Sequence, residues 1–339
     1  MITYINNQLK KREGKFHLKS EAFADAIISA IKENEIKVGD PLPSINEIIK
    51  ELNLSRKTIY TGYSILREQG IIGARERIGY YISSENVKKR LHILFVVNSL
   101  SPYLRDLFDA LRARLESFAK IELSTHGANP KTFTSLLKDN IEQYDKILIS
   151  GFNHSSFKKE LEKIPSEKLI LFSRDGGFKK AENYFLQDFL EGTYNALLQV
   201  SDTLTKYKNF YLIYDKKDKN FPIEIAQATE KISTHLGLKF FHLNNLSDTI
   251  DFRKSLFLLI DDNDLVAILE KIEKKKLVLG QDAGIISYNE TAIKRVIRQG
   301  ISTISIDFKK MGEMIADSIL NAENKQIKME TKFIKRPSF

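Results

Sequence analysis

The sequence predicts an α/β protein with two parts: a small N-terminal helical domain that ends in a β-hairpin, and a larger domain built on parallel sheets. Apolar residues recur at helical spacing over residues 20–66. From Leu91 onward, apolar strand-like runs alternate with helix-like segments, which is typical of parallel sheets covered by helices. A chain of 339 residues is long enough to bury two or three separate apolar cores.

Three helices are predicted in the N-terminal part, over residues 20–32, 44–52 and 55–69. A segment rich in glycine and proline, residues 37–43, separates the first helix from the second. Each helix begins at a serine whose hydroxyl can accept a hydrogen bond from a backbone N–H group of the first turn. These candidate N-caps are Ser20, Ser44 and Ser55. The spacing of the helices is that of a helix-turn-helix.

A β-hairpin is predicted directly after the third helix. Residues 71–72 and 80–82 read as two short strands, and they flank the segment GARERIG. The tip of this hairpin holds Arg75 and Arg77. A helix-turn-helix followed by such a hairpin is a winged helix-turn-helix, so we assign residues 1–82 to this domain.

The larger predicted domain covers residues 91–339 and follows a polar linker at residues 83–90. Its strand-like runs are 91–97, 120–123, 145–150, 168–172, 209–215, 238–243, 255–260, 277–280 and 284–288. Its helix-like segments are 104–118, a helix before Tyr144, 192–204, 222–236, 265–273 and 311–321. The alternation forms two series, which predicts two α/β layers.

Composition and charge limit the classes of function. The chain has no cysteine, which excludes a disulfide framework, a thiolate metal site and a cysteine nucleophile. Residues 1–20 contain no apolar run that could form the core of a signal peptide, and no uncharged apolar run of about 18 residues occurs elsewhere. We therefore expect a cytoplasmic protein with no membrane partner. Residues 1–90 hold 16 basic against 11 acidic residues, which slightly favours nucleic acid as a partner.

The N-terminal domain resembles the winged helix-turn-helix of the GntR family. The resemblance covers residues 20–83, and three motifs carry it: GDPLPS at 39–44, LSRKT at 54–58 and QGII at 69–72. A capped helix N-terminus offers N–H groups to phosphate, and the exposed face of the third helix can enter the major groove. Double-stranded operator DNA is therefore the expected partner.

The DNA contacts expected from this resemblance lie on the second and third helices and on the wing. Arg56 is the first choice for base readout, because arginine pairs with guanine through two hydrogen bonds. Lysine and tyrosine can hold phosphates, and wing arginines can reach a minor groove. The full set is Ser44, Asn46, Ser55, Arg56, Lys57, Thr58, Tyr60, Arg75, Arg77 and Gly79. The family usually has Glu-Arg where Ile45 and Asn46 stand, and Gly-x-Gly at residues 77–79, so we expect an atypical operator.

The larger domain resembles the periplasmic-binding-protein-like ligand domain of LacI-type repressors. The motifs that carry this resemblance lie late in the chain: IDDNDL at 260–265, GIISYNE at 284–290 and the segment 297–312. The resemblance implies two lobes that close over a ligand. It places lobe 1 at about residues 91–190 and 303–325, and lobe 2 at about residues 191–302 and 326–339.

A GntR head on a LacI-type body resembles sugar regulators of the arabinose repressor type, and implies a homodimeric repressor released from DNA by a sugar or sugar derivative. The expected effector contacts are polar residues near strand ends. They are Ser101, Tyr103, Arg174, Asp175, Asp188, Asp264 and Asn289. The family's arginine at the start of the first helix of lobe 2 is missing from residues 222–228. Either the ligand is unusual or the pocket uses another cation.

Two other interpretations are open. A regulator of the same DNA-binding type could sense a metabolite that is not a sugar. Alternatively, the head could be fused to an enzyme-like domain, since GntR heads also occur on aminotransferase-like domains that bind pyridoxal phosphate. The stretch 91–339 is short for that fold, and the sequence has no P-loop, Gly-x-Ser-x-Gly elbow or HExxH motif. We therefore expect no enzyme activity, no cofactor and no metal.

Overall fold

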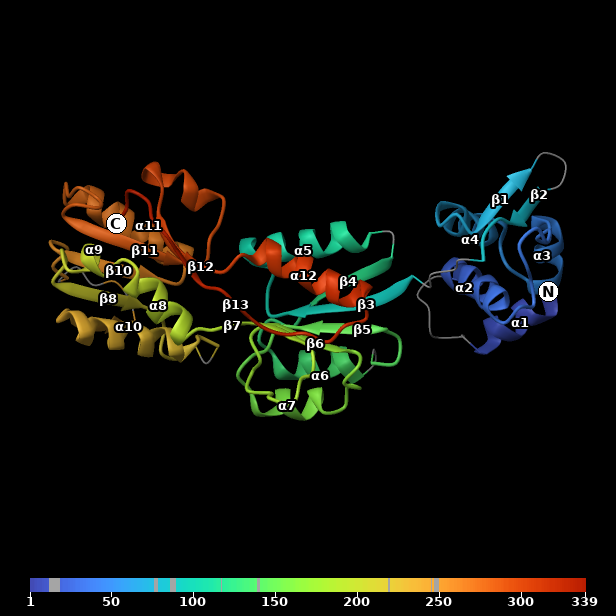
Figure 1. Cartoon of the computed structure of the whole chain (residues 1–339), viewed down its shortest axis with the longest axis horizontal. Coiled ribbons are helices and arrows are strands. Elements are labelled where there is room, and N and C mark those ends of the chain that lie inside the picture. Colours follow the sequence, from blue (N-terminus) through green and yellow to red (C-terminus); the bar gives the residue numbers. More distant parts are fainter. Residues whose placement is uncertain are drawn as a thin grey trace. The chain divides into compact units, whose positions relative to one another are not determined.

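The structure is a computed structural model, and it falls into two compact units (Figure 1). It describes residues 1–11, 19–75, 79–85, 90–116, 118–138, 141–218, 220–244, 246 and 250–339. The first unit contains Met1–His92 together with Glu116–Lys120 and Glu142–Asp145, and the second contains the remaining segments. The helices and the β-hairpin of the first unit, up to Ile82, are called the head below.

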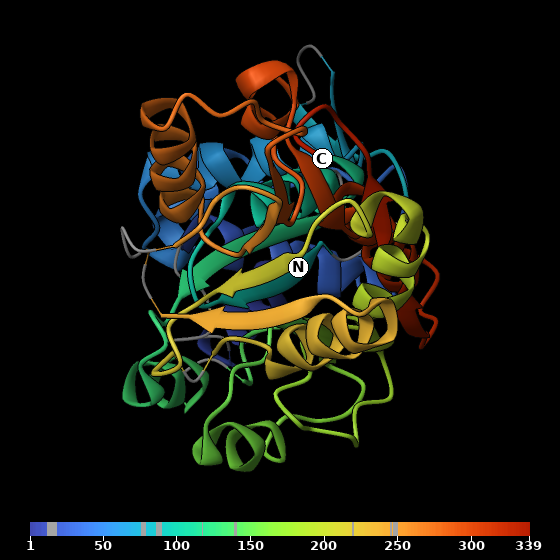
Figure 2. The ribbon, with the colours of Figure 1, turned by 90° about the vertical axis from the view of Figure 1, so that its left-hand side faces the viewer.

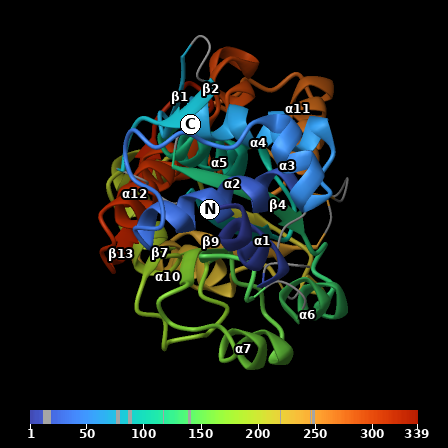
Figure 3. The same ribbon diagram turned by 90° about the vertical axis from the view of Figure 1, so that its right-hand side faces the viewer.

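The head is a helical domain with a two-stranded wing (Figure 3). Its elements are α1 (Ile2–Lys11), α2 (Lys19–Lys32), α3 (Ile45–Leu52), α4 (Arg56–Glu68), β1 (Ile72–Arg75) and β2 (Gly79–Ile82). The two strands pair antiparallel, with Ile72 opposite Ile82. One apolar core joins all of these elements, and Phe23, Ile48 and Ile59 are among its buried members.

Two features of the head differ from the expectations. Helix α1 was not expected, because its apolar residues are few and stand among polar ones. It buries Ile5 and packs against the same core as the helix-turn-helix. Ser20 is buried within α2 and is not the N-cap of that helix. A helical pattern alone does not locate a helix end to within a residue or two.

The first lobe of the second unit is a sheet of strand order β13-β7-β6-β5-β3-β4. Helices α5 and α12 lie on one face of this sheet, and α6 and α7 lie on the other (Figure 1). The strands are β3 (Leu91–Val97), β4 (Ala119–Thr125), β5 (Lys146–Ile149), β6 (Leu169–Ser173), β7 (Tyr184–Gln187) and β13 (Gln326–Met329). The helices are α5 (Pro102–Leu115), α6 (Pro130–Lys138), α7 (Ser155–Leu161) and α12 (Phe308–Leu320).

The second lobe is a sheet of strand order β14-β12-β11-β10-β8-β9, seen with its helices in Figure 2. Its strands are β8 (Asn209–Ile213), β9 (Lys239–Leu243), β10 (Ser255–Leu259), β11 (Ala283–Tyr288), β12 (Ser302–Ser305) and β14 (Lys332–Ile334). Its helices are α8 (Glu191–Leu198), α9 (Ser201–Leu204), α10 (Ile223–Leu236), α11 (Asp262–Lys274) and the short 3-10 turns η1 (Ile293–Arg295) and η2 (Ile297–Gln299). Only β14 pairs antiparallel within the described ladders of this sheet.

Both faces of the second sheet are buried, which explains why its central strands are apolar throughout. Along β10, Leu256 and Leu258 pack toward α8 and α10. Phe257 and Leu259 point to the opposite face and pack against α11. A strand alternates its side chains between the two faces of a sheet, so a continuous apolar run is the pattern of a strand covered on both sides.

The lobe boundaries differ from the expected ones at two places. Strand β12 was expected in lobe 1, but it pairs with β11 in the sheet of lobe 2. Strand β13 was expected in lobe 2, but it pairs with β7 in the sheet of lobe 1. The chain therefore returns to lobe 1 just before α12 and enters lobe 2 again between β13 and β14. Pairing between strands more than 100 residues apart leaves no local pattern in the sequence.

Several element assignments also change. The helix expected over residues 192–204 is divided into α8 and α9 around Val200, whose ψ of 22° is outside the helical range. The run 277–280 forms only an isolated bridge between Leu279 and Ala283, because Gly280 turns the chain with a φ of +82°. The expectations did not include α7, β7, β12, β13 and β14. None of the described helices is both long and apolar enough to cross a lipid bilayer.

Helices α5 and α12 approach each other closely at Gly312. A Cβ atom at this position would lie 2.3 Å from the backbone carbonyl oxygen of Leu107 on α5. We expect Gly312→Ala to lower the free energy of unfolding by about 1–3 kcal/mol, because the helices would have to separate. Urea unfolding of the second unit measures this loss. The exposed residue Lys309 on α12 provides the control, since Lys309→Ala should change stability by less than about 0.5 kcal/mol.

Candidate functional site

The first candidate site is the exposed face of the helix-turn-helix, where both helix starts are capped as expected. The Ser44 hydroxyl accepts a hydrogen bond from the Glu47 N–H at 3.3 Å, and the Glu47 carboxylate accepts one from the Ser44 N–H at 2.7 Å. That bond from the Ser44 N–H holds the pKa of Glu47 below its usual value. Ser55 caps α4 in the same way, accepting from the Thr58 N–H at 3.1 Å. These caps fix where each helix begins.

Helix α4 has one buried and one exposed face. Ile59, Tyr63 and Leu66 are buried, as expected for the inward stripe. The Tyr63 hydroxyl donates to the carbonyl of Pro43 at 2.7 Å, which ties α4 to the turn before α3. Burial raises the pKa of Tyr63 above its usual range, so the hydroxyl stays protonated. The helix is therefore held in a single orientation.

The opposite face of α4 carries the side chains expected to contact DNA. Arg56 and Lys57 are exposed in its first turn, and the Tyr60 side chain is 54% exposed. Thr61 and Ser64 are exposed too and were not expected. They stand four residues after Lys57 and Tyr60, so the helical period could have identified them.

Three further expected contacts lie on α3 and on the wing. Asn46, on the first turn of α3, accepts a hydrogen bond from the Arg56 guanidinium, with 2.9 Å between Nη2 and Oδ1. On the wing, the Arg75 guanidinium lies 4.4 Å from the centre of the Tyr81 ring. Gly79 has a φ of +89°, which suits glycine. Arg77 lies outside the described residues.

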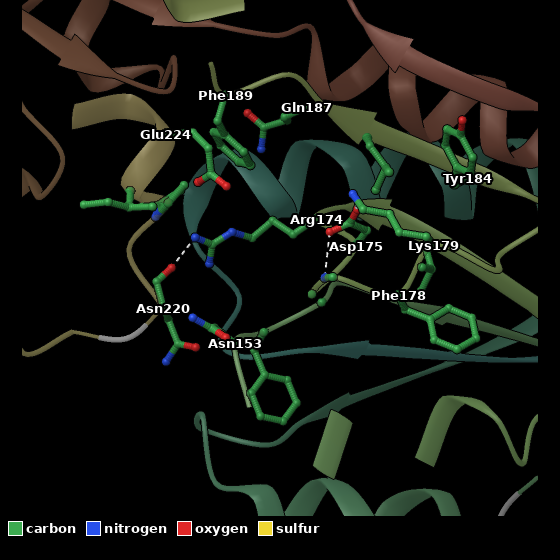
Figure 4. A pocket seen from close by; sticks show the side chains of 18 of the residues that line it. Asn153, Arg174, Asp175, Phe178, Lys179, Tyr184, Gln187, Phe189, Asn220 and Glu224 are labelled. Carbon is green, nitrogen blue, oxygen red and sulfur yellow. Dashed lines mark hydrogen bonds and ion pairs between the residues drawn. The ribbon is translucent and has the colours of Figure 1, made fainter. Parts of the chain in front are cut away.

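The second candidate site is a cleft of about 900 Å³ between the two lobes (Figure 4). Lobe 1 contributes the loops after β5 and β6, including Asn153 and Arg174. Lobe 2 contributes the segment before α10 and the first turn of that helix, including Asn220 and Glu224. The segment that leaves β7, including Phe189, completes the lining.

Arg174 is the central cation of this cleft. Its guanidinium donates to the carbonyl of Asn220 in lobe 2, and its Cζ atom lies 5.6 Å from the centre of the Phe189 ring. Burial lowers the pKa of Arg174, while Tyr103, Asp218 and Glu224 act in the opposite direction. Figure 4 shows the side chain pointing between Asn220 and Glu224. The Arg174 guanidinium therefore lies beside Asn220, just before the start of α10, where the sequence of this helix has no arginine.

Asp175 and Asp188 also line the cleft, but their carboxylates already have partners. Asp175 accepts from the Gly177 N–H at 2.8 Å and forms an ion pair with Lys179 at 2.5 Å. Asp188 accepts from the N–H of Glu191 at 3.1 Å and pairs with Lys328 at 2.8 Å. Burial alone would raise the pKa of Asp188, but these hydrogen bonds hold it below its usual value. Both residues thus also have a structural role.

The remaining expected contacts are not part of the cleft lining. The Tyr103 ring packs against Phe308, with 4.7 Å between the ring centres. Ser101 Oγ and Asn289 Oδ1 are buried and have no hydrogen-bond partner among the residues that the structure describes. Asp264 lies in the first turn of α11, where burial raises its pKa and Asp261 adds to the effect. Effector contact by these residues stays a prediction.

The structure adds cleft residues that sequence reasoning missed. They carry polar or aromatic side chains and lie in loops, at the end of β7 or in the first turn of α10. They are Asn153, Gln187, Phe189, Asn220, Phe221 and Glu224. Gln187 and Phe189 are the sequence neighbours of Asp188, an expected contact, so their position beside it could have identified them. Nothing in the sequence joins Asn153 to residues 220–224. Together these groups offer hydrogen-bond donors, acceptors and aromatic faces.

The head matches a known family of DNA-binding domains. Residues 19–82 match the family described as bacterial regulatory proteins, gntR family. The head is a GntR-family domain. The protein is therefore a DNA-binding transcription regulator, and the exposed faces of α4 and the wing belong to its GntR domain.

The second unit has the two-lobed fold of LacI-type regulators, as expected. The trehalose repressor from Escherichia coli is 13% identical with a TM-score of 0.61, and the match covers 73% of this chain and 100% of that chain. A LacI family regulator from Lactobacillus casei, with bound glucose, is 12% identical with a TM-score of 0.61, covering 73% and 99%. A PurR family regulator from Vibrio parahaemolyticus is 14% identical with a TM-score of 0.60, covering 73% and 98%. These likenesses confirm the fold class.

Proposed function

We propose that the protein is a homodimeric repressor of carbohydrate-utilisation genes, and that a small sugar or sugar derivative in the cleft releases it from its operator. The observation that carries this proposal is the chemistry of the cleft between the lobes, in a chain that also has a GntR head. Arg174, Glu224 and two aromatic rings, Phe189 and Phe221, line one space of about 900 Å³. This volume suits a monosaccharide or a small oligosaccharide.

The lining matches the chemistry of a sugar. A hydroxyl group both donates and accepts hydrogen bonds, so a sugar site needs partners of both kinds. Arg174 donates, and Glu224 accepts and has no hydrogen bond or ion pair within the described residues. The amides of Asn153 and Asn220 do both. The apolar C–H face of a sugar ring packs against aromatic rings such as that of Phe221. The Phe221 ring stacks on Tyr214, with 3.7 Å between the ring centres.

The proposed mechanism couples the cleft to the arrangement of the lobes. Arg174 of lobe 1 reaches the Asn220 carbonyl of lobe 2, so an effector that takes hydrogen bonds from Arg174 changes a contact between the lobes. The lobes can be in equilibrium between an open and a closed arrangement. A ligand shifts this equilibrium only if it binds one arrangement more tightly than the other. In a dimer, two heads read two half-sites about one helical turn or more apart. Lobe closure that changes the separation of the heads then weakens operator binding.

The first test measures operator binding by the pure full-length protein, on its own upstream DNA and at stated salt. The panel contains pentoses, deoxyhexoses, hexoses and sugar phosphates, with nucleosides and amino acids as other polar metabolites. We expect one sugar to weaken operator binding by about 5- to 150-fold, the usual range of coupling between two sites. If a nucleoside or an amino acid weakens operator binding and no sugar does, the sugar effector is wrong and the effector belongs to that other class.

Arg174→Met should remove the effector response while the protein still binds its operator specifically. The substitution keeps most of the length and apolar character of the side chain but removes all guanidinium donors. Titration of operator complexes with the effector from the panel measures the response. The control is Arg253→Met, an exposed arginine of lobe 2 outside the cleft lining, which should respond normally. Full induction of the Arg174 variant would remove this residue from the site.

Arg56→Ala should weaken specific operator binding by about 1–3 kcal/mol and relax the preference at one base pair, since an arginine pair with guanine is worth this much. Lys57→Ala should instead weaken binding to all sequences and reduce the slope of affinity against salt by about 1, because one phosphate contact is lost. Binding to the operator and to single-base variants, at several salt concentrations, separates these effects. An unchanged base preference in the Arg56 variant would contradict its role.

A further inference from the structure

Asn46 is the residue that contacts the expected base-reading arginine. Its Oδ1 atom accepts a hydrogen bond from Nη2 of Arg56 at 2.9 Å, and both side chains are exposed. The two residues come from different helices, each in the first turn after a capped N-terminus. Within the described residues, Arg56 makes no ion pair with a carboxylate.

The chemical nature of this contact points to recognition and away from a structural salt bridge. A guanidinium carries five N–H donors, and one hydrogen bond to an amide leaves four for DNA. The amide oxygen is neutral, so it orients the guanidinium without cancelling its positive charge. A carboxylate would orient the same group but would oppose a phosphate-rich partner.

The fold of the helix-turn-helix does not depend on this contact. The two helix starts are fixed by the hydroxyls of Ser44 and Ser55, and the helices are joined through the buried Tyr63 and its bond to Pro43. An exposed hydrogen bond between two side chains adds little to stability, because water competes for both groups. The contact can therefore be removed while the head stays folded.

We propose that Asn46 is a positioning residue for operator recognition, which holds Arg56 in the orientation that a guanine of the operator requires. A flexible arginine loses rotamer freedom when it binds, and a partner that restricts it beforehand reduces this loss. The inference rests on the proposed role of Arg56 in base readout. It gives a function to the position at which the chain departs from the usual Glu-Arg pair of GntR heads.

A double-mutant cycle on the full-length protein tests the proposal. Operators selected from a randomised pool identify the base pair whose preference Arg56→Ala abolishes. Asn46→Ala should reduce the preference at that same base pair by about three- to tenfold, and should leave the slope of affinity against salt unchanged because no charge is lost. In the Arg56→Ala background, Asn46→Ala should have no further effect, since a positioning residue acts only through its partner.

Two additional variants separate positioning from structure and charge. Lys50→Ala, at an exposed position of the same helix, should leave the preference at that base pair unchanged. Asn46→Asp should weaken binding to every sequence, because it keeps the contact but adds a negative charge. Amide hydrogen exchange in α3 and α4 should be the same in the wild type and the Asn46→Ala variant, which verifies that the head is folded.

The outcomes distinguish the inference from the function on which it rests. If Arg56→Ala abolishes a base preference but Asn46→Ala does not alter it, the inference is wrong and the role of Arg56 stands. The inference is also wrong if Asn46→Ala weakens binding to all DNA sequences equally, or if the effects of Asn46→Ala and Arg56→Ala add. In both cases Asn46 would contact DNA independently of Arg56. If Arg56→Ala leaves every base preference intact, both the role of Arg56 and the positioning role fail.

Discussion

The position of the cleft between the lobes depends on strand pairing between segments far apart in the chain. In lobe 1, β13 pairs with β7 in a register that joins Gln326 to Tyr184, and the Lys325 N–H bonds to the side chain of Asn183, 142 residues earlier. In lobe 2, β12 pairs with β11. The chain therefore passes between the lobes at several points, and these connections hold the end of β6 opposite the start of α10. That juxtaposition brings Arg174 to Asn220.

In the head, core packing and helix caps keep the charged face of α4 exposed to solvent and fixed in position. Burial of Ile59 and Tyr63 sets the rotation of α4, and the hydroxyl caps set where the helix begins. The helical period then places Arg56, Lys57 and Tyr60 on the opposite face of α4, which is exposed to solvent. In the proposed recognition, the hydrogen bond to the neutral amide of Asn46 orients the Arg56 guanidinium and leaves its positive charge available to a polyanion.

The cleft is lined both by groups that already have partners within the fold and by groups that have few. The carboxylates of Asp175 and Asp188 are occupied by lysines and backbone N–H groups, and they shape the loops on which the site stands. Among the described residues, the guanidinium of Arg174 makes one hydrogen bond and the carboxylate of Glu224 makes none. Arg174 and Glu224 share the cleft without forming an ion pair, which supports the proposal that a polar molecule binds there.

Local pattern was sufficient for the elements whose stability comes from one amphipathic face or one long apolar run. The third helix, the wing, and strands such as β3 and β10 were predicted with ends correct to within a few residues. Short edge strands such as β7 and β14 were missed, because four or three residues with mixed polarity carry no distinctive period. The helix α7 was missed for the same reason, since it covers only seven residues.

The sequence by itself determined that this protein has a DNA-binding head of the GntR type and a LacI-type α/β body, because helical caps, periodicity and motif spacing are properties of contiguous residues. It also predicted Arg56 as a DNA contact and Arg174 as an effector contact, and both roles stay predictions. Only the tertiary structure decided which residues share a site: Asn46 with Arg56, and Arg174 with Glu224. The physical reason is that both sites are assembled across elements whose relative placement comes from core packing and long-range strand pairing, neither of which a linear pattern contains.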